Sequence, residues 1–139
     1  MSYTHTITVD LSYSEAVERT RQALAAQGFG VLTEIDIRAT FEKKLGAEAA
    51  QAVGDYVILG ACNPGLASRA LAAEPEIGAL LPCNVVVRRA AGDTATTVEA
   101  IDPQTMVKLG GSQQVGEVAD DADTRLRAAL QAITDSSRS

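Results

Sequence analysis

Hydrophobic residues recur along this chain at two spacings, and each spacing predicts a different kind of element. Between Thr4 and Asp10, His5 and apolar residues alternate with threonines, which predicts a strand with one buried face. After Ser12, apolar residues follow at intervals of three and four, which predicts a helix. Ser12 and Glu15 can form a capping box at the start of this helix, and Gly28 suits its C-terminal end.

The run from Gly30 to Arg38 alternates again and predicts a second strand. One face of this strand would carry Val31, Thr33, Ile35 and Ile37. Glu34 and Asp36 are two positions apart on the other face, so their carboxylates are expected to project on the same side.

The same signals assign the rest of the chain. They predict a helical stretch over 39–53 that Gly46 can split, and then a buried strand over 55–61. A helix starting at Pro64 behind an Asn63 cap follows, and after it a short turn after Pro75. The chain is then predicted to form a hairpin of strands 84–89 and 96–101, a short helix after Asp102-Pro103, and a last helix over about 119–134.

This order, β-α-β-α-β-α-β-β-α-α, predicts an α+β fold. We expect a single two-layer domain over residues 1–135, with a mostly antiparallel sheet of about five strands and helices packed on one face. Residues 136–139 are predicted to be a flexible C-terminal tail. The second face of the sheet is harder to cover with these elements, so we expect a homodimer that shares apolar surface.

Composition narrows the range of partners. The chain has 139 residues, the usual size of one domain, and a formal net charge of -6 with scattered basic residues. Nucleic acids and anionic membranes need a concentrated positive surface, so neither is expected as a partner. The first residues lack the features of a signal peptide, which predicts a cytoplasmic protein with reduced thiols.

The two cysteines carry the most informative local pattern. Each stands beside an asparagine and a proline where a strand meets another element, in Cys62-Asn63-Pro64 and Pro82-Cys83-Asn84. If the two strands are antiparallel neighbours, the end of one lies beside the start of the next. We therefore predict a small pocket at these junctions, with Cys62, Asn63, Cys83 and Asn84 as ligand-binding residues. The alternative is that both cysteines are small buried hydrophobic residues at strand ends.

A divalent metal ion is one ligand that these residues would suit. Thiolates bind soft divalent metals, and a histidine or carboxylate can complete about four ligands. The metal-ligand candidates are Cys62, Cys83, His5 and Glu34, with Asp36 as a further candidate ligand-binding carboxylate. The spacing matches no known zinc motif, and the alternatives are a packed His5 and carboxylates that face solvent.

Several motifs in one order resemble those of a known family. They are Gly28-Phe29-Gly30-Val31-Leu32-Thr33-Glu34-Ile35-Asp36, Leu59-Gly60-Ala61-Cys62-Asn63-Pro64, Glu74-Pro75-Glu76-Ile77-Gly78 and Leu81-Pro82-Cys83-Asn84-Val85-Val86-Val87. From about residue 5 to residue 135, the chain resembles the bacterial and archaeal family called domain of unknown function 302. The resemblance implies a small α+β domain that forms homodimers, and it implies no function.

Two main function classes follow from these residues. The first is a dimeric module that binds or senses a small molecule or a metal ion at the cysteine junctions. The alternative is a thiol-based redox protein or enzyme that uses Cys62 and Cys83 as catalytic residues. A third possibility is a stable scaffold whose motifs serve folding alone. A single histidine argues against hydrolases of the Ser-His-Asp or Cys-His type.

Overall fold

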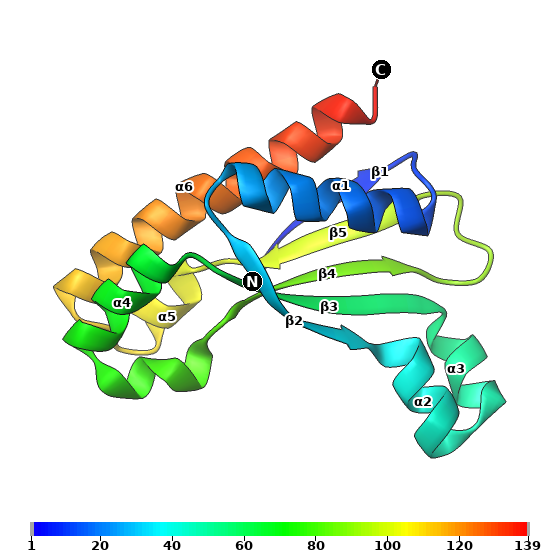
Figure 1. Cartoon of the computed structure of the whole chain (residues 1–139), viewed down its shortest axis with the longest axis horizontal. Helices are drawn as coiled ribbons and strands as arrows, with labels where there is room; N and C mark the ends of the chain where they lie inside the picture. Colours follow the sequence, from blue (N-terminus) through cyan, green and yellow to red (C-terminus); the bar gives the residue numbers. More distant parts are fainter. Residues whose placement is uncertain (1, 139) are drawn as a thin grey trace.

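Five strands form one antiparallel sheet in the computed structural model of this chain, which describes residues 2–138 (Figure 1). Across the sheet the order is β1 (Thr4–Val9), β5 (Thr96–Ile101), β4 (Cys83–Arg89), β3 (Asp55–Cys62) and β2 (Gly30–Asp36). Every neighbouring pair is antiparallel. The predicted α+β fold with a five-stranded sheet is confirmed.

The helices form one layer on the sheet and two smaller groups at its ends (Figure 1). The layer consists of α1 (Tyr13–Ala26) and the long α6 (Gln113–Ser136), which pack against each other. At one end lie α2 (Ile37–Leu45) and α3 (Ala47–Val53), which Gly46 separates. At the other end α4 (Pro64–Ala73), the 3₁₀ helix η1 (Pro75–Leu80) and α5 (Gln104–Lys108) gather beside the first half of α6.

The two faces of the sheet differ in burial. Residues that pair directly in an antiparallel sheet share a face. The face toward α1 and α6 is buried and includes Val57, Leu59, Val85, Val87 and Val98. The other face is only partly buried and includes Tyr56, Ile58, Val86, Arg88 and Glu99. The homodimer that would cover this second face stays a prediction.

A β-bulge in β2 overturns one detail of the predicted strand faces. The register between β2 and β3 shifts between Val31 and Thr33, so Leu32 is an extra residue in the ladder. Val31 pairs with Ala61 on the helix-covered face, whereas Thr33 pairs with Gly60 on the other face. The prediction that Val31 and Thr33 share a face was wrong, because a bulge reverses the alternation of every residue beyond it.

The last helix begins earlier than its sequence pattern predicted. Ser112 accepts a hydrogen bond from the backbone N–H of Val115 at 3.3 Å and caps α6, which starts at Gln113 rather than near Ala119. Gly116 lowers the helix propensity of this first stretch, which hid the signal. At the other end Ser136, expected in the tail, is the last residue of α6, and its carbonyl accepts a hydrogen bond from Arg19 at 2.6 Å. Ser139 lies outside the described residues.

Two hydrophobic clusters hold the described part of the chain together. The main core lies between the sheet and the α1–α6 layer, and Leu59, Val87 and Leu126 are among its most buried members. A satellite cluster joins α4, η1, α5 and the first half of α6, and it consists of Leu66, Ala70, Ile77, Met106, Val115, Val118, Ala119 and Ala122. Helix α6 therefore supplies side chains to both clusters.

Across residues 2–138, each helix is too short or too polar to cross a membrane.

Candidate functional site

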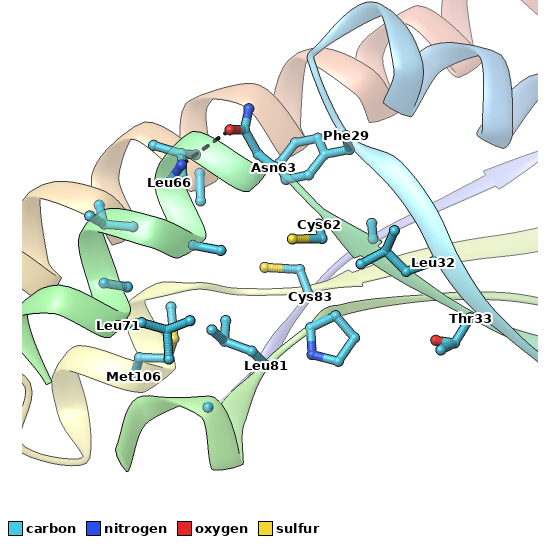
Figure 2. Close-up of a pocket in the computed structure, with 17 residues that line it drawn as sticks. Phe29, Leu32, Thr33, Cys62, Asn63, Leu66, Leu71, Leu81, Cys83 and Met106 are labelled. Carbon is cyan, nitrogen blue, oxygen red and sulfur yellow. Dashed lines mark hydrogen bonds between the residues drawn. The ribbon is translucent and has the colours of Figure 1, made fainter. Parts of the chain in front are cut away.

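Both cysteines line one cavity at the end of the sheet. Strands β3 and β4 are antiparallel neighbours, and Ala61 pairs with Cys83 in their register. Cys62 is the last residue of β3, and Cys83 is the first residue of β4. Figure 2 shows both sulfur atoms directed into the space between the sheet end and α4. The antiparallel pairing thus brings the two thiols to the same edge.

The cavity lies where the main core and the satellite cluster meet, and its volume is about 330 Å³. Its walls come from β2, β3, β4, α4, η1, α5 and α6 and the residues that flank them. The lining side chains are mostly apolar and include Phe29, Leu32, Ala61, Leu66, Ala67, Ala70, Leu71, Leu81, Met106, Val118 and Ala122 (Figure 2). Many of these side chains are small, and this leaves the volume unfilled.

A close contact between strands shapes one rim of the cavity. A Cβ atom at Gly60 would overlap Oγ1 of Thr33 and lie 2.9 Å from Cγ of Pro82. Thr33 and Pro82 both line the cavity, so glycine at position 60 is what lets these side chains approach the β3 backbone.

Asn63 lines the cavity, but the oxygen of its side-chain amide caps a helix. Its Oδ1 accepts a hydrogen bond from the backbone N–H of Leu66 at 3.2 Å, which caps α4 (Figure 2). Its Nδ2 points toward Gly28, where an added Cβ would be only 2.9 Å away. The predicted ligand-binding amide of Asn63 is therefore used as a helix cap.

Asn84 does not belong to the cavity. It pairs with Gly60 and is exposed on the partly buried face of the sheet, where it lines a shallow depression with Arg88 and Glu99. Cys83 pairs with Ala61 on the helix-covered face, whereas Asn84 pairs with Gly60, so the alternation along β4 directs the Asn84 side chain to the other face and away from the cavity. The prediction that Asn84 joins the thiols was wrong for this reason.

The Cys83 thiol is held in its neutral form. Burial raises the pKa of Cys83 to about 11, and the neighbouring Cys62 adds to the shift. Burial penalises the thiolate because a charged sulfur loses its hydration in apolar surroundings. At neutral pH this group is therefore a weakly polar part of the cavity wall.

The structure does not bring the predicted metal ligands together. Glu34 pairs with Arg21 of α1 at 2.9 Å, because its side of β2 faces that helix. Asp36 accepts a hydrogen bond from the Ala39 N–H at 2.9 Å and caps α2. His5 Nε2 lies 2.6 Å from Oδ1 of Asp123 on α6. The set of Cys62, Cys83, His5 and Glu34 is therefore not formed as a metal centre in the described part of the chain.

The sequence analysis missed most of the residues that line the cavity. Leu66 and Ala70 fall in the helix predicted to start at Pro64, and Met106 falls in the short helix predicted after Asp102-Pro103, but nothing connected these segments in space. Ala122 lies within the predicted last helix, whereas Val118 lies before its predicted start, which was placed too late. The apolar positions of the three helices were the available signal, and only the fold shows that they meet around one space.

The fold and the cavity together define a class: a small α+β domain with an apolar cavity between one end of its sheet and a cap of short helices. Residues 5–133 match the family described as domain of unknown function DUF302, and the chain belongs to this family. A crystal structure of an uncharacterised conserved DUF302 protein from Bacillus stearothermophilus is similar, with a TM-score of 0.84 and 29% sequence identity. That similarity covers 96% of this chain and 99% of the other. No curated protein matches.

Proposed function

We propose that this protein binds a small, mainly apolar molecule in the cavity beside Cys62 and Cys83. The observation that carries the proposal is a space of about 330 Å³ with an apolar lining in a small domain. Ligand sites are typically concave and lined mainly by apolar side chains, as this space is. Ligand pockets begin at roughly 300 Å³, so the cavity is large enough for a compact ligand.

The polar groups around the cavity favour an apolar ligand over a charged one. Asn63 uses its carboxamide as a helix cap, and Asn84 faces the other side of the sheet. The Cys83 thiol is neutral at physiological pH, since its pKa is raised to about 11. A charged ligand would find no charged partner among the described side chains that line this space. An apolar ligand gains roughly 25 cal/mol for each Å² that it removes from water.

The alternative function, a thiol-based redox protein, has less support. The attacking species in thiol exchange is a thiolate, and burial disfavours the thiolate of Cys83. Cys62 is only half-buried and would have to start any such reaction.

Calorimetric titration with indole and with 1-hexanol tests the proposal. Both probes are small enough for the cavity and have one polar group at most. We expect saturable binding of one probe molecule per chain. Ala67→Leu places an isobutyl group in the cavity and should weaken binding at least about tenfold, which is roughly 1.4 kcal/mol.

Ala72→Leu is the matched control. Ala72 lies on the same helix, is exposed, and does not line the cavity. The substitution adds the same isobutyl group, and this variant should bind both probes like the unmodified chain. Absence of saturable binding, or equal weakening by the two substitutions, would reject the proposed site.

A further inference from the structure

Outside the set of residues that line the cavity, three ligand-type side chains from separate elements meet on the helix-covered side of the sheet. His5 lies on β1, Asp102 follows β5 directly, and Asp123 lies on α6. His5 Nε2 is 2.6 Å from Asp123 Oδ1 and 3.7 Å from Asp102 Oδ1. One ligand atom from each residue lies within 4.8 Å of the other two.

We propose that His5, Asp102 and Asp123 form a binding site for a divalent transition-metal ion. Each ligand atom of a four-coordinate zinc lies about 2.0–2.2 Å from the ion, which places neighbouring ligand atoms roughly 3.4 Å apart. The two measured separations, 2.6 Å and 3.7 Å, bracket this value. Small side-chain rotations therefore suffice to enclose an ion.

The charge around the cluster supports a cation. The side chains of His5, Asp102 and Asp123 are only 20%, 17% and 14% exposed. One guanidinium offsets only part of the charge of these two carboxylates, since Arg127 Nε contacts Asp123 Oδ2 at 3.2 Å. Within residues 2–138, Asp102 has no lysine or arginine partner within 4 Å.

Hydrogen bonds fix the position of the Asp102 carboxylate and of Asp120 on the neighbouring helix. Gln104 donates a backbone hydrogen bond to Asp102 at 2.9 Å, and its side chain donates one to Asp120 at 2.6 Å. The backbone N–H of Asp102 donates to the carbonyl of Tyr3 at 2.8 Å, which ties the strand end beside His5. Because partly desolvated carboxylates are costly without a counter-charge, a divalent ion would stabilise this arrangement.

The donor set indicates the class of metal. Imidazole nitrogen suits zinc, copper, iron and nickel, whereas carboxylate oxygen also suits manganese. A site with one imidazole and two carboxylates is therefore expected to bind Zn²⁺ or Co²⁺ and to leave at least one position for water. This site is independent of the apolar cavity and of the function proposed for it.

Because His5 is the only histidine, imidazole NMR gives an unambiguous test. The full chain, without an affinity tag and after treatment with a chelator, is titrated with Zn²⁺ while the ¹⁵N signals of the imidazole are recorded. We expect a saturable shift of Nε2 that is complete at one equivalent. Co²⁺ should produce visible absorption bands with the same stoichiometry.

Asp123→Asn and Asp102→Asn should each weaken Zn²⁺ binding at least about tenfold, and the use of two variants guards against misfolding of one of them. Asp121→Asn is the matched control, because Asp121 lies on the same helix and contacts Arg125 and Arg69 instead. The double variant Cys62→Ser, Cys83→Ser should bind Zn²⁺ like the unmodified chain.

Imidazole signals that do not change when Zn²⁺ is added would overturn the proposal. His5 would then be only a partner of the two carboxylates. Equal losses in Asp121→Asn and Asp123→Asn would also overturn it, because they would indicate a general charge effect. Loss of binding only in the double cysteine variant would move the metal to the thiols and overturn it as well.

Discussion

The main core and the satellite cluster share one helix, yet they differ in how completely they fill space. In the main core, branched side chains of β3, β4 and β5 pack directly against α1 and α6, and Leu59 is fully buried. In the satellite cluster, short helices span the end of the sheet instead of stacking on its face, and the cavity remains at the junction.

The residues at that junction explain the difference. Ala61, Ala67, Ala70 and Ala122 line the cavity together with Gly78, so small side chains stand where larger ones would fill the space. The same chain thus builds a tightly packed core and a less filled cluster, where we propose that a ligand binds. Four experiments on variants test whether the two clusters differ in packing in this way.

Truncation of a leucine should cost more in the main core than at the cavity. Large-to-small core substitutions cost about 2–5 kcal/mol, depending on the cavity that they leave. We expect Leu59→Ala, at a position with 0% exposure, to lower the free energy of unfolding by about 4 kcal/mol. Leu66→Ala, 7% exposed beside the existing cavity, should cost about 2 kcal/mol. Urea unfolding measures both, and equal costs would contradict the contrast.

Enlargement of an alanine should show the opposite asymmetry. Ala16 on α1 is 0% exposed in the main core, so Ala16→Leu should destabilise by about 3 kcal/mol through overpacking. Ala67→Leu has space to occupy and should change the free energy of unfolding by less than about 1 kcal/mol. Thermal unfolding of the two variants under identical conditions provides the comparison. A similar loss in both would mean that the cavity is filled in solution.

Substitution of Gly60 at the cavity rim should destabilise the protein. Gly60→Ala places a Cβ against Thr33 Oγ1 and 2.9 Å from Pro82 Cγ, and we expect a loss of about 2 kcal/mol. Thr33→Ala removes one of these clashes and should restore part of the loss in the double variant. A double-mutant cycle from urea unfolding measures this coupling, and strictly additive effects would argue against the contact.

The last prediction concerns the pH dependence of Cys83. Its pKa is raised to about 11 in the folded protein from 9.0 without the surrounding structure, because burial disfavours the thiolate. In the Cys62→Ser variant, which keeps the burial but removes the smaller contribution of Cys62, the alkylation rate of Cys83 by iodoacetamide should rise with a midpoint well above pH 9. The unfolded chain loses its proton first, so the contribution of this thiol to stability is present below pH 9 and is lost between pH 9 and pH 11. A midpoint near pH 9 would show that the thiol is solvated.

The sequence predicted the parts that depend on local pattern or on neighbouring strands. The hairpin of β4 and β5, the caps at Ser12 and Asn63, and the antiparallel fold were within its reach. The bulge at Leu32 was not, because an extra residue in a ladder leaves no mark on an alternating pattern. Asn84 was misplaced because the predicted strand began at residue 84, whereas β4 begins at Cys83, so the alternation that separates the two residues was not applied.

The contacts made by distant segments lay beyond a reading of one sequence. His5 and Asp123 are 118 positions apart, and His5 already had a local interpretation as a packed residue of its strand. The cavity likewise depends on how three short helices close one end of the sheet, and the sequence of any one of these segments does not indicate that arrangement.

The most direct test of the proposed binding function is an NMR titration of the ¹⁵N-labelled chain with indole. We predict saturable shifts concentrated at the cavity, including the amides of Phe29, Ala61 and Cys83, and their loss in Ala67→Leu but not in Ala72→Leu. Shifts that never saturate, or that map to the partly buried face of the sheet around Val86, would contradict the account.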